Sequence, residues 1–112
     1  MLVAKRHQTV TPLEELSISD LTAAADLLRA VANPVRMAML LRIAHEPKCV
    51  HELLDDLGIS QPLASQHLRI LRGAHLVTGT RRGKEIAYTI ADEHVAHIVR
   101  DAILHGNEHR TL

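Results

Sequence analysis

The segment LDDLGISQPLASQHL restricts the fold more than any other part of the sequence. Gly58 favours the end of a helix there, because glycine adopts left-handed backbone angles at little cost. Ser60 favours the start of another helix, and Pro62 falls in its first turn, where a missing N–H costs little. The segment therefore predicts two helices, over about 50–57 and 61–73, joined by a turn of about three residues.

Two more helices are predicted before this pair. The apolar spacing in LTAAADLLRAV is helical and indicates a helix over about 18–32, with Ser19 or Asp20 as its cap. Asn33 is a favoured N-cap and Pro34 a favoured first helical residue, so a second helix is expected to begin there.

The pattern changes after Gly73, which is expected to end the helix before it. LVTGT and EIAYTI are β-prone and are separated by RRGK, which predicts a β-hairpin with Gly83 at a positive φ. Helical spacing returns over about 92–106. Residues 1–17 have no clear period and are expected to form a flexible N-terminal arm, which leaves one domain over residues 18–112.

The apolar residues indicate an aliphatic core. The chain has 112 residues, 46% of them apolar, but no Phe or Trp, and Tyr88 is its only aromatic residue. Leu63, Leu68 and Leu71 have the spacing expected of core positions. A single domain of this size gains stability from dimerisation. The lone cysteine excludes a disulfide within the chain, and the protein is expected to be cytoplasmic because it has no bilayer-length apolar run and no signal-peptide core.

Basic residues gather in one part of a chain that has no net charge. Between residues 57 and 84 there are five basic residues and no Asp or Glu, whereas the rest has eight basic and thirteen acidic residues. One basic face on a neutral protein is typical of a nucleic-acid binder. Helix, short turn, helix and basic hairpin together describe a winged helix-turn-helix. This mainly α fold with a small β-hairpin places one helix in the major groove.

Polar side chains of the helix 61–73 and of the hairpin are the candidates for DNA contact. Gln bonds adenine, Arg bonds guanine or phosphate, and basic residues at the hairpin tip bind the backbone. Such residues also occur on ordinary solvated helices, so the whole set supports this interpretation rather than any one member. A small module buries little surface, so a homodimer on two half-sites of double-stranded operator DNA is expected. The candidates are Ser60, Gln61, Ser65, Gln66, Arg69, Arg81, Arg82 and Lys84.

The run CVHELLDDLGISQPLASQHLRILRGAHLVTGTRRGKEIAYTI resembles the ArsR/SmtB family of bacterial metal-responsive repressors. The resemblance covers about residues 18–109, and SQPLASQHLRIL is its most specific part. It implies a homodimeric repressor that binds operator DNA without metal and releases it when metal binds. Zinc-sensing members carry the pattern D-x-H, ten residues, H-x-x-E/H on the last helix, which Asp92, His94, His105 and Glu108 match.

The spacing on the last helix supports a site shared between two chains. Four of the chain's nine histidines lie on or beside this helix. His94 and His105 fall on one helix face but roughly 16 Å apart, too far to share one ion. The pairs His94/His105 and Asp92/Glu108 are centred on the same point, near Val99. An antiparallel mate therefore gives two sites, each with two imidazoles and two carboxylates, a set that closes tetrahedrally around Zn(II).

Several alternatives remain open for the metal ligands. Asp92 is also a suitable N-cap for the helix, and that role explains an aspartate at this position without a metal. His109 is an alternative to Glu108, and His97 is placed to hydrogen-bond a ligand. Ni(II) or Co(II) is the alternative to Zn(II), because these ions take more ligands and His97, His109 or His7 of the arm offers them.

A weaker second metal site is predicted where the helix 50–57 begins. Cys49, Glu52 and His7 offer a mixed ligand set. Arsenic sensors of the family resemble C-V-C here, but this chain has His51 in place of the second thiol, which disfavours arsenic, cadmium and lead. Cys49 is equally suited to being a small buried residue.

Two other classes of function remain as alternatives. A DNA-binding regulator with no metal role would use its histidines only to pack the dimer interface. An enzyme, such as a metal hydrolase, is not expected, because the sequence offers no open metal position beside a general base.

Overall fold

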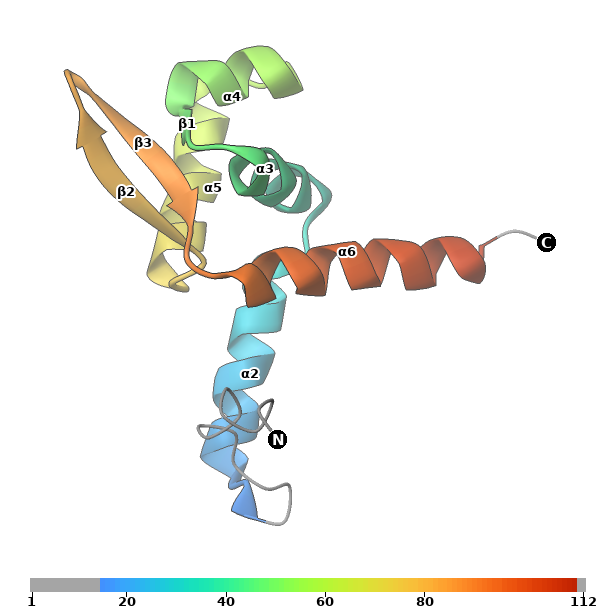
Figure 1. Cartoon of the computed structure of the whole chain (residues 1–112). Helices are drawn as coiled ribbons and strands as arrows, with labels where there is room; N and C mark the ends of the chain where they lie inside the picture. The colour runs from blue at the N-terminus through green and yellow to red at the C-terminus, as the bar shows by residue number, and fades with distance from the viewer. Residues whose placement is uncertain (1–14, 111–112) are drawn as a thin grey trace, which may run out of the picture.

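Five helices and a three-stranded sheet form residues 15–110, the part of the chain that the computed structural model describes (Figure 1). The predicted order of helices and hairpin is confirmed, with one short strand added. The arm expected over residues 1–17 lies almost entirely outside the described residues. The elements are α2 (Ile18–Val31), α3 (Pro34–His45), β1 (Lys48–Cys49), α4 (Val50–Leu57), α5 (Gln61–Gly73), β2 (Val77–Arg82), β3 (Glu85–Ile90) and α6 (Glu93–Glu108).

The cap of α2 differs from the prediction. Ser17, not Ser19 or Asp20, is the N-cap, and its hydroxyl accepts a hydrogen bond from the Asp20 N–H at 3.2 Å. The Asp20 carboxylate accepts one from the Ser17 N–H at 2.9 Å, which completes a capping box. The reciprocal bonds satisfy two N–H groups that a helix start leaves without partners.

The turn between α4 and α5 forms as predicted. Gly58 ends α4 with φ +64°, and the Ser60 hydroxyl caps α5. Asn33 likewise caps α3 through its side-chain oxygen. α5 ends at Gly73, as predicted, and a left-handed φ of 61° falls two residues later, on His75, where the chain turns toward β2.

The hairpin β2–β3, called the wing below, carries a third strand that the sequence does not reveal. β2 and β3 pair antiparallel from Val77↔Ile90 to Arg82↔Glu85, around a turn in which Gly83 has φ +65°. β1 pairs with the other edge of β3, giving the order β1-β3-β2. Its two residues are too few to show a period of two. This strand joins the start of α4 directly to the wing.

An aliphatic core joins α3, α5 and α6, as the composition predicts. Leu40, Leu71 and Val99, one from each helix, have no exposed surface. Leu63 is predicted to lie in this core, but 37% of it is exposed. The buried face of α5 begins one residue later, at Ala64. One residue rotates a helix by about 100°, which is enough to move Leu63 to the edge of that face.

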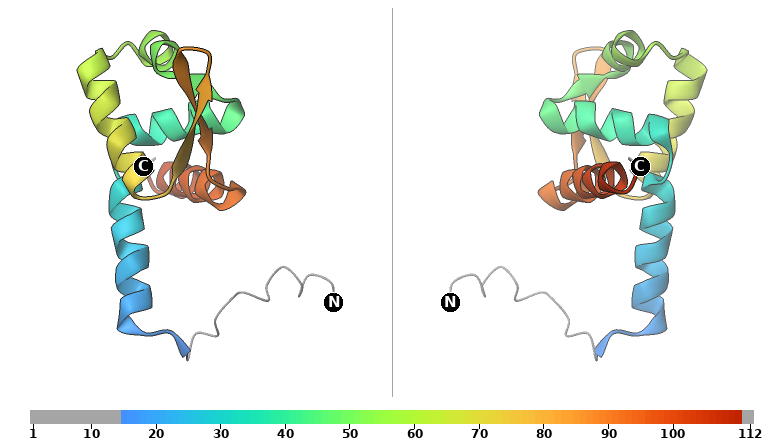
Figure 2. Two further views of the ribbon diagram at one scale, coloured as in Figure 1. Left: turned by 90° about the vertical axis from the view of Figure 1, so that its left-hand side faces the viewer. Right: turned by 90° about the vertical axis from the view of Figure 1, so that its right-hand side faces the viewer.

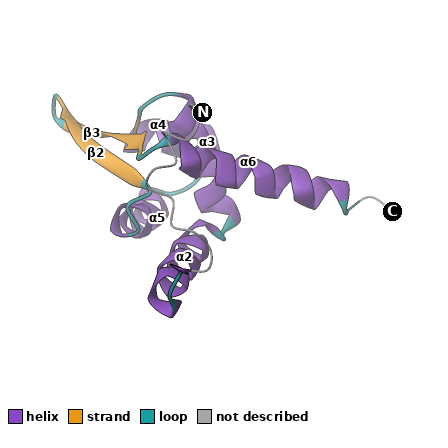
Figure 3. Cartoon of the chain, turned by 60° about the horizontal axis from the view of Figure 1, so that its bottom comes forward, coloured by secondary structure: helices purple, strands orange, loops and turns teal. Residues whose placement is uncertain are grey.

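Two helices extend beyond the core. The first part of α2 and the second part of α6 leave the body in different directions (Figures 1, 2 and 3). Every residue from 100 to 110 is exposed, including Leu104 at 60%, and Leu28 on α2 is 51% exposed. Aliphatic side chains exposed on projecting helices are suited to packing against another chain. No described helix is both long and apolar enough to cross a membrane.

Gly58→Ala is expected to destabilise the protein by about 1–2 kcal/mol, because a Cβ is strained at a positive φ. Apart from Gly58 and its two chain neighbours, nothing lies within 4 Å of the added Cβ, so the loss comes from the backbone conformation. Gly73→Ala is the matched control, since Gly73 is helical with equal space around it. The Gly73→Ala change is expected to raise the free energy of unfolding by about 0.5–1 kcal/mol. Urea unfolding measures both, and equal effects of the two changes would contradict this account of the turn.

Candidate nucleic-acid interface and metal centre

The predicted polar residues of α5 share its exposed side. Gln61, Ser65, Gln66 and Arg69 are all exposed, whereas the opposite side of α5 packs into the core. Ser60, the cap, is exposed as well, although its hydroxyl is engaged with the helix N-terminus. The helix therefore presents amide, hydroxyl and guanidinium groups on a continuous outer surface, and these groups match base edges and phosphates.

A shallow cleft lies between α5 and the sheet and adds one basic residue to this surface. Ser65, Arg69 and Arg72 of α5 line it, with Tyr88 of β3 opposite. Arg72 is not among the residues predicted to contact DNA. The sequence does contain a signal for this residue. Arg72 comes three residues after Arg69, and that spacing puts both side chains on neighbouring turns of one helix face.

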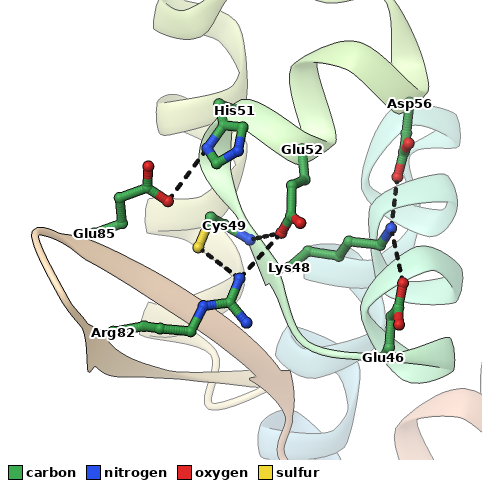
Figure 4. A network of polar contacts seen from close by, with 8 residues as sticks. All are labelled: Glu46, Lys48, Cys49, His51, Glu52, Asp56, Arg82 and Glu85. Atoms are coloured by element: carbon green, nitrogen blue, oxygen red, sulfur yellow. Dashed lines mark hydrogen bonds and ion pairs between the residues drawn. The ribbon is translucent and has the colours of Figure 1, made fainter.

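The wing carries the three predicted basic residues near its tip. Arg81, Arg82 and Lys84 are all exposed. Arg82 nevertheless turns back toward α4, where its Nη2 lies 3.0 Å from the Cys49 Sγ and 3.3 Å from a Glu52 carboxylate oxygen (Figure 4). The structure therefore separates Arg82, which is engaged within the chain, from its two basic neighbours.

A buried histidine holds α5 in place. His67 is 8% exposed, and its Nδ1 lies 3.2 Å from the Arg36 guanidinium. Arginine can only donate, so Nδ1 accepts and the imidazole is neutral. Burial, and then the charge of Arg36, lower the pKa of His67. Arg36 also donates to the Ala30 carbonyl at 2.6 Å, so one guanidinium joins the end of α2, the start of α3 and α5.

The predicted zinc ligands lie at the two ends of α6. Asp92 is the N-cap, with Oδ1 accepting the His94 N–H at 2.9 Å. At the other end, ligand atoms of His105, Glu108 and His109 all lie within 4.8 Å of one another. All five side chains are exposed. Among residues 15–110 this C-terminal group is the one set of three or more such ligands that a single chain brings together. His97 is exposed one turn after His94, in a separate hollow between α6 and α3.

The predicted second site near Cys49 contains a guanidinium. Arg82 lies against both the Cys49 thiol and the Glu52 carboxylate, so the described ligands of that site already share a cation. A hydrogen bond with Glu85 and then burial raise the pKa of the Cys49 thiol, which favours the protonated form. Metals bind the thiolate. His7, the remaining ligand of this prediction, lies outside the described residues, so the second site stays a prediction.

These features together define a winged helix-turn-helix protein. Residues 33–78 match the family described as "Bacterial regulatory protein, arsR family". The chain is 54% identical over 88 residues to the HTH-type transcriptional repressor SmtB of Mycobacterium tuberculosis, across 79% of this chain. That match spans 65% of the length of the relative. This chain is also 35% identical to the HTH-type transcriptional regulator NmtR of the same organism, across 98% of this chain and 88% of NmtR.

A solved structure gives the same fold. The homodimeric winged helix-turn-helix DNA-binding domain of a possible ArsR-family regulator from Mycobacterium bovis superposes with a TM-score of 0.77. It is 27% identical, and the superposition covers 87% of this chain and 90% of that one. The chain belongs to the ArsR/SmtB family of transcriptional regulators.

His67→Gln is expected to weaken the acid sensitivity of folding. Because folding lowers the pKa of His67, its neutral form contributes stability above the ordinary histidine value of about 6.5, and that contribution is lost as the pH falls. Urea unfolding at several pH values from neutral to mildly acidic measures the difference in free energy of unfolding between variant and wild type. This difference should shrink as the pH falls. His45→Gln, at an exposed position of α3, controls for the loss of a histidine. A constant difference for His67→Gln would contradict the assignment.

Proposed function

We propose that this protein is a homodimeric repressor that binds operator DNA in the metal-free state and releases it when Zn(II) binds at the dimer interface. One observation carries the proposal. The metal-ligand side chains lie at opposite ends of α6, on a helix whose second part leaves the body of its own chain. A second copy, packed antiparallel, brings the two ends together.

The outer surface of α5 supports DNA binding. Gln61, Gln66 and Arg69 are suited to base edges, with Ser65 and Arg72 beside them. Arg81 and Lys84 on the wing are suited to phosphates, which position a protein without reading sequence. Two such surfaces related by two-fold symmetry would contact two half-sites of a palindromic operator.

The exposed apolar side chains support dimerisation through α6 and α2. Ile103 and Leu104 on α6 line a shallow hollow with Leu41 and Arg100. Leu28 of α2 is exposed on the other projecting helix. The relative from Mycobacterium bovis is described as homodimeric. Burying these surfaces in a symmetric pair would remove aliphatic area from water and place two α6 helices side by side.

The donor chemistry of α6 fits Zn(II). His105 and Glu108 already lie close enough to bind one ion. Asp92 caps the helix with Oδ1, and a carboxylate has lone pairs left for a metal while it does so. With His94 and Asp92 from the partner chain, the set is two imidazoles and two carboxylates. A zinc ion there would bridge the two chains. The imidazoles must be neutral to bind it, so acid is expected to weaken the response.

Release of DNA then follows from linkage. Metal binding must favour a dimer geometry that fits the operator poorly, since a ligand shifts an equilibrium only by its difference in affinity for the two states. DNA must weaken metal binding by the same factor. In this chain α6 packs on α3, and Arg36 of α3 contacts His67 of α5. These contacts join the ligand helix to the DNA-contacting helix.

Ni(II) or Co(II) sensing is the second candidate, and the position of His109 favours it. The His109 ring centroid lies 4.4 Å from that of His105, so one chain offers three donors and the shared site five. Nickel and cobalt take more ligands than zinc in proteins. The absorption spectrum of the Co(II)-substituted protein separates the two cases, because tetrahedral and octahedral Co(II) absorb with very different intensity.

Zn(II) is expected to release the protein from a labelled fragment of its own promoter, and His105→Ala is expected to bind that fragment but ignore Zn(II). The variant loses one imidazole from each site while α5 and the wing stay intact. Fluorescence anisotropy with chelator and then with added Zn(II) measures both effects. His45→Ala, at an exposed histidine outside α6, is the control and should respond like the wild type. Equal DNA binding by the wild type with and without metal would contradict zinc sensing.

Mixing two inactive variants tests whether the site is shared between chains. His94→Ala and His105→Ala homodimers should each lack a complete site. In a mixed dimer one site loses both imidazoles, but the other keeps all four ligands. After exchange of equal amounts, about a quarter of the wild-type zinc capacity should therefore return. If His94→Ala alone kept full capacity, the ion would bind within one chain, at His105, Glu108 and His109.

A further inference from the structure

We propose that Arg82 is a positioning residue, which fixes the wing against the start of α4 instead of contacting DNA. This inference rests on the proposed DNA binding, and it revises the expectation that Arg82 binds phosphate. It is carried by a network of polar contacts between the wing tip and the first turn of α4 (Figure 4).

The first set of contacts centres on the guanidinium. Arg82 Nη2 donates to the Cys49 Sγ at 3.0 Å and to the Glu52 carboxylate at 3.3 Å. The same oxygen of Glu52 accepts the Cys49 backbone N–H at 2.8 Å. That backbone bond, together with the positive charge of Arg82, lowers the pKa of Glu52, so the carboxylate is ionised at neutral pH. The Arg82 cation therefore faces a full negative charge on α4.

A second contact holds the other strand of the wing. Glu85 lies 3.2 Å from the His51 ring, and Glu85 is the cross-strand partner of Arg82. Arg82 and Glu85 flank the turn at the wing tip, one on each strand. Each contacts a side chain in the first turn of α4, so both strands are attached to α4 at the wing tip. β1 pairs with β3 only at Ala87 and Tyr88, nearer the body. A two-stranded ribbon is marginally stable by itself, and β1 supports only the part nearer the body, so these contacts help to fix the direction of the wing tip.

The strand geometry divides the basic residues of the wing into two groups. Neighbouring side chains on a strand point to opposite faces. Arg82 faces α4, so Arg81 before it points away, and Lys84 lies in the turn beyond. If Arg82 left α4 for a phosphate, the Glu52 carboxylate would lose its cation near a polyanion. Arg81 and Lys84 are therefore the residues of the wing that are available to phosphates.

The test is Glu52→Gln in the metal-free, full-length protein, because the two accounts predict opposite signs. Removing a negative charge near DNA should strengthen binding if only charge matters. Release of the wing from α4 should instead weaken promoter binding, by up to about fivefold. Glutamine keeps the reach-back bond to the Cys49 N–H, so α4 stays capped. Asp55→Asn is the matched control. Asp55 is an exposed acid of the same helix, whereas Asp56 pairs with Lys48 at 3.0 Å.

Salt dependence separates positioning from phosphate binding. Arg82→Gln should weaken binding without changing the slope of log affinity against log salt. Arg81→Gln should lower that slope by about one for each phosphate that the variant no longer binds. Adding Arg82→Gln to Glu52→Gln should cause little further weakening. Amide exchange at the wing tip should quicken in both single variants, which gives a readout without DNA.

Binding by Glu52→Gln as tight as by Asp55→Asn would overturn the inference, and so would a lower salt slope for Arg82→Gln. Wild-type protein that fails to bind its promoter would instead contradict the proposed function. If Glu52→Gln folds poorly by circular dichroism, the salt slopes of the Arg81 and Arg82 variants still decide the question.

Discussion

Burial of one aliphatic face, shared by α3, α5 and α6, positions every surface to which we assign a function. Leu40, Leu71 and Val99 belong to one core cluster and have no exposed area, so the three helices have fixed orientations relative to one another. The outer side of α5 is thereby directed to solvent with its Gln, Ser and Arg residues together. Val99 is the last buried residue of α6, and the helix continues beyond the core to Glu108.

The extension of α6 links the two proposed activities. Within residues 15–110, one chain leaves the aliphatic residues near the end of this helix exposed, and the candidate ligands at the two ends of the helix lie too far apart to share one ion. In the proposed dimer a second chain would do both. The contact that buries apolar surface would then also complete the metal sites, so in this proposal a change of metal state would alter the relative placement of the two α5 helices.

Local signals predicted most of the fold, whereas contacts between distant residues escaped them. Gly58, Ser60 and Asn33 placed three helix boundaries, because a cap depends on neighbouring residues only. The left-handed angle at His75 was missed because glycine is the usual residue there. The spacing of the candidate ligands on α6 was visible because one helix carries it. The Arg82–Cys49 contact joins residues 33 positions apart, and no local pattern records it.

The placement of ligands at both ends of one helix has a consequence for how metal preference evolves. In the proposed dimer each ligand is encoded once and used twice, in two sites related by symmetry. A single codon change at Glu108 alters both sites together, and His109 already stands beside it. A lineage can therefore exchange one donor set for another in one step, without passing through a dimer whose two sites prefer different ions.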